Sequence, residues 1–167
     1  KDNTLEQLIS ISKQDPRVIV LEFSRNFGKE PAMTAGIDAA SGDCVIPMDA
    51  DLQDPPEAIP EMYQAWKKGS QTVVAERSSR SESNKVLFNT FYFLLHKVAP
   101  TLPPVNFGTH CLLDFSVIQR IRSLKEKNRY FPGLVGFVSS KVDSIPVHRL
   151  KRTEGNSRVG LRGLIQL

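Results

Sequence analysis

The sequence predicts an α/β fold with a mainly parallel sheet flanked by helices, and two observations lead to this prediction. Short apolar runs rich in β-branched residues alternate with helix-like segments along the first half of the chain. The length of 167 residues suits one domain with its own core. Three apolar runs are the expected strands, namely Val18–Phe23, Cys44–Met48 and Thr72–Ala75.

Helices are expected between these strands, because polar and apolar residues there recur at helical spacing. Asn3 or Thr4 can cap the first helix, and paired prolines open the third helix, which Gly69 ends. In parallel sheets, ligands bind beyond the carboxyl ends of the strands. Asp49 and Arg77 follow two of the expected strands, so we expect them to face one site. The expected helices cover about Leu5–Lys13, Lys29–Ala40 and Pro55–Lys68.

The second half of the chain is less regular, and its prolines predict several loops. We expect a helix or turn at Tyr130–Val138, where Pro132, Gly133 and Gly136 interrupt an apolar run. The chain starts with a helix and ends within a pattern, so we expect it to be part of a longer protein. The other expected elements are helices over Asn84–Val98 and Ser116–Leu124 and strands over Cys111–Leu113 and Val142–His148.

Composition and charge exclude several classes of protein. The chain is 40% hydrophobic and 24% charged, and it lacks the roughly 18 uninterrupted apolar residues of a membrane-spanning helix. Its two cysteines, Cys44 and Cys111, are too far apart for a Cys-x-x-Cys motif, so we expect reduced thiols. These features exclude a secreted disulfide-stapled fold, a membrane-spanning domain and a coiled coil.

The charges are unevenly placed, although the formal net charge is only +4. Residues 148–167 are strongly basic, whereas Asp49–Glu61 contains five carboxylates and no basic residue. An acidic centre with basic flanks suits a metal ion with polyphosphate groups better than it suits duplex DNA. The alternative is a set of solvated faces, which explains most charge runs taken singly.

The most informative segment is the acidic stretch VIPMDADLQDPPE, residues 45–57. Asp49 and Asp51 stand two residues apart at the end of an expected strand, and Gln53 continues the same alternation. Carboxylate and amide oxygens are ligands that Mg²⁺ or Mn²⁺ takes together with substrate phosphates. The alternative is an acidic loop at the start of the helix that Pro56 opens, where negative charge is also favourable.

Several motifs together resemble family 2 glycosyltransferases of the polyprenyl-phosphate type, such as dolichol-phosphate mannosyltransferases and bactoprenol-phosphate glucosyltransferases. The matching segments are Arg25–Lys29 (RNFGK), Thr34–Gly36 (TAG), Asp49–Glu57 (DADLQDPPE), Asn128–Phe131 (NRYF) and Arg152–Arg158 (RTEGNSR). The resemblance implies a Rossmann-like GT-A catalytic domain, of which residues 1–167 would be a part. The first strand with the nucleotide-base site, and in many members membrane helices, would lie outside this stretch.

The resemblance also implies roles for individual residues. Asp49, Asp51 and Gln53 would hold Mg²⁺ or Mn²⁺, with Asp49 also available to the donor ribose. Arg25, Asn26 and Lys29 would line the pocket of a UDP- or GDP-sugar. The acceptor phosphate would meet guanidinium groups, which pair with phosphate in bidentate fashion. The residues implied for the acceptor are Arg77, Arg80, Arg152, Ser157 and Arg158, and the set implied for catalysis is Asp49, Asp51, Arg77 and Arg152.

One segment departs from the family pattern. Many relatives carry D-x-G-D-F-R where this chain has Asn106–Cys111, so two carboxylates are absent. A phosphate acceptor is largely ionised at neutral pH and needs no base, whereas a sugar hydroxyl acceptor usually does. The departure is therefore compatible with a polyprenyl phosphate acceptor. His110 and Asp114 are the remaining candidate bases.

The resemblance implies inverting transfer of a sugar to a polyprenyl phosphate at the cytoplasmic face of the cell membrane. The expected helix around Leu87–Val98 carries an aromatic stripe, which either packs in the core or lies against the bilayer. One alternative is a family 2 enzyme with a saccharide acceptor, and another is a non-catalytic module that binds phosphate or nucleic acid. We expect no nucleic acid partner, because the aromatic residues are not interleaved with basic ones.

Overall fold

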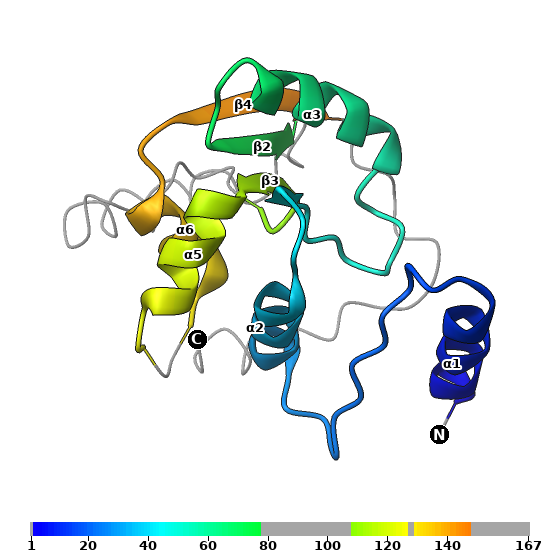
Figure 1. The fold of residues 1–167 in the computed structure, drawn as a ribbon. Helices are drawn as coiled ribbons and strands as arrows, with labels where there is room; N and C mark the ends of the chain where they lie inside the picture. Colours follow the sequence, from blue (N-terminus) through cyan, green and yellow to red (C-terminus); the bar gives the residue numbers. More distant parts are fainter. Residues whose placement is uncertain (1, 78–107, 127–128, 148–167) are drawn as a thin grey trace, which may run out of the picture. The chain divides into compact units, whose positions relative to one another are not determined.

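The computed structural model describes residues 2–77, 108–126 and 129–147 (Figure 1). Contacts divide the chain into two compact units, Lys1–Ser41 and Gly42–Leu167. The expected helix over Asn84–Val98 lies outside the described residues, as does the basic stretch 148–167. Within the described part of the chain, no helix is long and apolar enough to cross a membrane.

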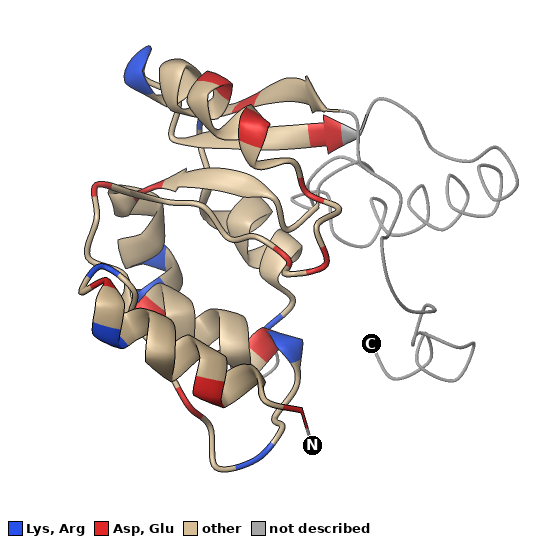
Figure 2. Ribbon diagram, turned by 90° about the vertical axis from the view of Figure 1, so that its right-hand side faces the viewer, with Lys and Arg blue, Asp and Glu red and all other residues tan. Residues whose placement is uncertain are grey.

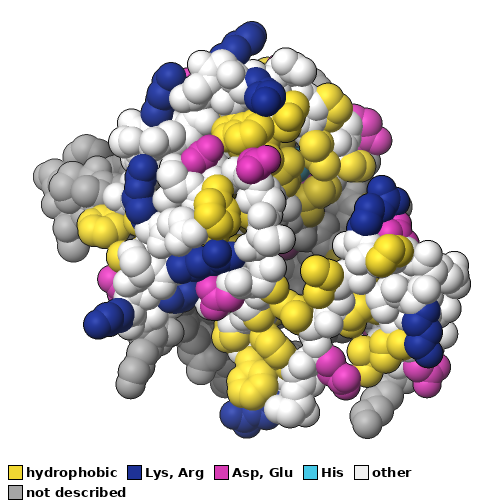
Figure 3. Space-filling view, in the orientation of Figure 1, with side chains coloured by type: hydrophobic (Ala, Val, Ile, Leu, Met, Phe, Trp, Pro, Cys, Tyr) yellow, Lys and Arg dark blue, Asp and Glu magenta, His cyan; other side chains and the backbone are white. Residues whose placement is uncertain are grey.

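The unit Lys1–Ser41 contains the first two expected helices, α1 (Thr4–Gln14) and α2 (Lys29–Ala39). Asn3 occupies the N-cap position of α1, but its side chain makes no capping bond; the Asp2 carboxylate instead accepts from the Thr4 N–H at 3.3 Å. None of the α1 residues is buried, and hydrophobic side chains reach the surface around this helix (Figure 3).

The expected strand at Val18–Phe23 is wrong, because this segment forms no strand. Its apolar residues are exposed, with Ile19 at 72% and Leu21 at 50% of their full accessible surface. β-branched composition gives a segment strand propensity, but a strand exists only where a neighbour completes its hydrogen-bond ladder. No strand in the described part of the chain pairs with these residues.

The unit Gly42–Leu167 is built on a four-stranded sheet in the order β1-β3-β2-β4. β3 is antiparallel to both β1 and β2, whereas β2 and β4 are parallel, so β1, β2 and β4 share one direction. The predicted α/β class is confirmed, and the sheet is mixed: three of its four strands point in the same direction and β3 points the opposite way. The strands cover β1 (Cys44–Val45), β2 (Thr72–Arg77), β3 (Cys111–Asp114) and β4 (Val142–Val147).

The first strand of this sheet is shorter than expected. The sequence predicted Cys44–Met48, whereas β1 contains only Cys44–Val45. Pro47 has no backbone N–H and cannot donate to a ladder, which explains why pairing does not continue through it. The chain therefore leaves the sheet earlier and reaches Asp49 through an extended segment.

Helices cover the sheet from two sides, with α3 on one side and α5 and α6 on the other (Figure 1). The helices are η1 (Pro56–Ala58), α3 (Ile59–Lys67), α5 (Phe115–Ser123) and α6 (Phe131–Val138). Strand residues alternate between the two sides, as the period of two requires. The core beside α3 comprises Ala58, Met62, Val73, Ala75, Leu112, Ile145 and Val147.

Candidate functional site

The carboxyl ends of β1, β2 and β4 lie at one edge of the sheet, because these strands run in the same direction. Arg77 ends β2 opposite Val147, the last residue of β4. Asp49 follows the end of β1, so both predicted residues belong to this edge. Figure 2 shows the acidic segment between β1 and η1 on the same side as the arrowhead of β2.

The segment that carries the predicted metal ligands alternates in burial. Asp49, Asp51 and Gln53 are half-buried, whereas the intervening Ala50 and Leu52 are exposed. The Asp51 carboxylate accepts a hydrogen bond from the Gln53 backbone N–H at 3.2 Å. The three predicted ligands are thus less exposed than the residues between them, and their assignment to a metal stays a prediction.

These side chains fit a hard divalent cation by their chemistry, since they offer two carboxylates and one amide oxygen. Across the described residues, no group of three or more His, Cys, Asp or Glu side chains forms a cluster that could hold a metal. Mg²⁺ commonly takes only one or two protein carboxylates and completes its shell with substrate phosphates and water. The donor set matches that mode of binding.

The loop predicted to line a donor pocket belongs to the unit Lys1–Ser41 and is ordered by its own contacts. The Asn26 side-chain oxygen accepts from the Gly28 N–H at 2.8 Å, and the Arg25 guanidinium lies 4.7 Å from the centre of the Phe27 ring. Gly28 has a φ of 94° at the N-cap of α2, a conformation that favours glycine. Lys29 is the first residue of that helix.

The two candidate bases lie at opposite edges of the sheet. His110 immediately precedes β3, and its carbonyl accepts from the Ala75 N–H at 3.1 Å, which places it near the carboxyl end of β2. Its side chain is buried, with only 4% of the residue exposed. Asp114 ends β3 and pairs with Cys44 at the start of β1, so it belongs to the other edge.

The Asp114 carboxylate has structural partners. One oxygen accepts from the Ser116 N–H at 2.8 Å and caps α5, and the other accepts from the Trp66 indole N–H at 2.8 Å. Burial raises the pKa of Asp114, but these hydrogen bonds and the charge of Arg120 outweigh it, so the pKa lies below its ordinary value. With both oxygens engaged by hydrogen-bond donors at the far edge of the sheet, the Asp114 carboxylate is poorly placed to act as a general base for the site.

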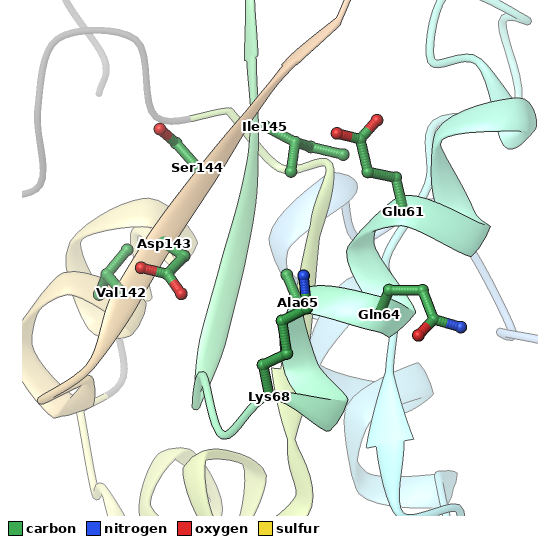
Figure 4. A pocket seen from close by; sticks show the side chains of 8 residues that line it. All are labelled: Glu61, Gln64, Ala65, Lys68, Val142, Asp143, Ser144 and Ile145. Atoms are coloured by element: carbon green, nitrogen blue, oxygen red, sulfur yellow. The ribbon is translucent and has the colours of Figure 1, made fainter.

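A groove of about 580 Å³ lies away from the predicted site, between α3 and β4 (Figure 4). Gln64 and Lys68 line it on one wall, and Asp143 and Ser144 on the other. Asp143 is further held by a hydrogen bond from the Ser70 hydroxyl. None of the residues that the sequence assigned to a site lines this groove.

The family model for "Glycosyl transferase family 2" matches residues 1–122, which include the RNFGK loop and the acidic segment. The chain belongs to glycosyl transferase family 2. Four residues that the family resemblance implies for the acceptor phosphate lie outside the described part of the chain, namely Arg80, Arg152, Ser157 and Arg158.

Relatives within this family are similar over most of the chain. The bactoprenol glucosyl transferase of Shigella phage SfV is 39% identical over 161 residues, which cover 95% of this chain and 52% of the relative. The prophage bactoprenol glucosyl transferase homolog of Escherichia coli K12 is 37% identical, with coverages of 95% and 53%. The chain thus spans about half the length of the curated relatives it matches.

Solved structures of similar fold support the same architecture. The glucosyl-3-phosphoglycerate synthase of Mycobacterium tuberculosis, crystallised with Mn²⁺, UDP-glucose and glycerol 3-phosphate, superposes with a TM-score of 0.55 at 20% identity. The match covers 93% of this chain and 58% of that one. The family 2 chain therefore has a GT-A-like α/β fold with a mixed sheet flanked by helices, as the resemblance implied.

Sequence reasoning missed two features of this family 2 domain. One is the link from Trp66 on α3 to Asp114, whose residues are 48 positions apart. The other is the backbone of Leu52, whose φ is +58° within the acidic segment. Neither has a sequence signal, since the first depends on tertiary packing and leucine is not a residue that favours positive φ.

Proposed function

We propose that the protein transfers a sugar from a nucleotide-sugar donor to a polyprenyl phosphate at the cytoplasmic face of the membrane. One observation carries the proposal: relatives named bactoprenol glucosyl transferase are 37–39% identical over 95% of the chain. A UDP-sugar, such as the UDP-glucose named for the structural neighbour, is the donor that we favour over a GDP-sugar. The hydrocarbon of such an acceptor requires a membrane, which supports the proposed location.

In this proposal the donor diphosphate lies against the acidic segment. Asp51 and Gln53 would hold Mg²⁺ or Mn²⁺, and Asp49 would hold the same ion or the donor ribose. When bound, the ion supplies positive charge that stabilises the departing nucleoside diphosphate. Arg25, Asn26 and Lys29 would contribute donor contacts, as the family resemblance implies.

The acceptor phosphate is its own nucleophile. A phosphate oxygen forms a bond to the anomeric carbon while the bond from that carbon to the donor diphosphate breaks, with inversion at the carbon. Because the phosphate is largely ionised at neutral pH, the reaction needs orientation and charge stabilisation more than it needs a base. Arg77 would supply part of that charge at the carboxyl end of β2, together with Arg80, Arg152 and Arg158, and the Ser157 hydroxyl would add a hydrogen-bond donor.

The proposal is tested by transfer of labelled sugar from UDP-glucose or GDP-mannose to undecaprenyl phosphate in detergent, using the full-length protein with Mn²⁺. Asp51→Asn should abolish transfer, because it removes a ligand charge. The matched control is Glu57→Gln, which removes one exposed negative charge from the neighbouring turn and should leave transfer intact. Transfer to a saccharide but not to the lipid would refute the acceptor, and equal activity of wild type and Asp51→Asn would refute the site.

A further inference from the structure

Leu52 has an unusual backbone conformation. Among the residues that the structure describes, it is the only residue other than glycine with a positive φ, at +58°. The left-handed region costs free energy for any residue with a Cβ, and leucine has no side-chain group that could compensate locally. Burial of the leucine side chain does not offset this free energy, since 68% of the residue is exposed.

The conformation has a consequence for the residues on either side. Leu52 stands between Asp51 and Gln53, and the turn that it makes brings the Gln53 N–H to the Asp51 carboxylate at 3.2 Å. Both neighbours are half-buried while Leu52 points outward. The turn at Leu52 therefore holds the Asp51 carboxylate against the backbone of Gln53, the other residue to which the metal is assigned. Backbone strain of this kind persists where surrounding structure enforces it, most often at functional segments.

We propose that Leu52 is a positioning residue, whose left-handed backbone sets Asp51 and Gln53 in the arrangement that binds a divalent cation with a nucleoside diphosphate. This inference rests on the proposed function and adds that residue 52 must adopt a positive φ. Any residue that tolerates a positive φ should therefore function at this position, whatever its side chain. Asparagine tolerates this region well, whereas β-branched valine does not.

The test is calorimetric titration of the full-length protein with UDP in the presence and absence of Mn²⁺. We expect Leu52→Val to weaken Mn²⁺-dependent UDP binding about 5- to 10-fold and Leu52→Asn to stay within about twofold of wild type. Leu21→Val is the matched control, because Leu21 is also an exposed leucine outside any helix or strand. Circular dichroism verifies that each variant is folded.

Two results would overturn the inference. Leu52→Val binding like wild type would show that the conformation is dispensable, and equal losses in Leu52→Val and Leu52→Asn would show that the leucine side chain matters instead. Failure of the proposed function looks different, since wild type and Asp51→Ala would then both lack Mn²⁺-dependent UDP binding. That outcome would overturn the inference together with the site on which it rests.

Discussion

Replacing Asp114 by alanine removes a contact that joins three elements of the fold. The carboxylate caps α5 through the Ser116 N–H and accepts from the Trp66 indole on α3, both at 2.8 Å. Loss of an N-cap costs about 1 kcal/mol, and a hydrogen bond to a charged group contributes about 1.5–3 kcal/mol, less at a partly exposed site. We therefore expect Asp114→Ala to lower the free energy of unfolding by about 2–3 kcal/mol.

Urea unfolding followed by circular dichroism measures this loss. Asp43→Ala is the control, because its side chain is an exposed carboxylate adjacent to β1, and we expect a change of less than about 0.5 kcal/mol there. A double-mutant cycle with Trp66→Phe should give a coupling energy near 1 kcal/mol. A loss below about 0.5 kcal/mol in Asp114→Ala, or additive single losses, would refute the assigned contacts.

The same contacts predict a pH dependence: folding lowers the pKa of Asp114 from 3.8, so its stabilising contribution is present above that pH and is lost as the pH falls through the lower folded-state pKa. Unfolding midpoints between pH 5 and 2.5 should therefore fall more steeply in wild type than in Asp114→Asn, and parallel curves would contradict this. The thiols should also differ in reactivity. Burial raises the pKa of the fully buried Cys111 to about 12. Burial and the charges of Asp43 and Asp114 also raise the pKa of Cys44, but this thiol is only half-buried and is open to reagent. Iodoacetamide at pH 8 should label Cys44 at least tenfold faster in the native protein, as measured by mass spectrometry, and equal rates would contradict the burial of Cys111.

Local sequence patterns predicted the helices well, because the residues that begin or end a helix lie within a few positions of its ends. α2 begins at Lys29 as expected, and the apolar run with Pro132 near its start forms α6. Strand pairing could not be predicted in the same way, since it depends on segments far apart in sequence. The run Val18–Phe23 has strand composition without a described partner, and the antiparallel direction of β3 has no local signal.

The sequence predicted the location of those candidate residues that come just after an expected strand, such as Asp49 and Arg77. Asp49, Asp51 and Gln53 are half-buried and alternate with exposed residues, and their role as metal ligands stays a prediction. The position of Asp114 at the opposite edge follows from the direction of β3, which the sequence does not specify. The φ of Leu52 was likewise beyond prediction, because the dihedral reflects the loop as a whole and not the preference of leucine.

The central claim is that this family 2 chain uses its acidic segment to transfer a sugar to a lipid phosphate. The most direct measurement is the product formed by the full-length protein from labelled UDP-glucose, undecaprenyl phosphate and Mn²⁺, analysed by thin-layer chromatography with and without Asp51→Asn. We predict an acid-labile glucosyl phospholipid that forms in wild type and in Glu57→Gln but not in Asp51→Asn. Label found only in free glucose or in a saccharide, or lipid product retained in Asp51→Asn, would contradict the claim.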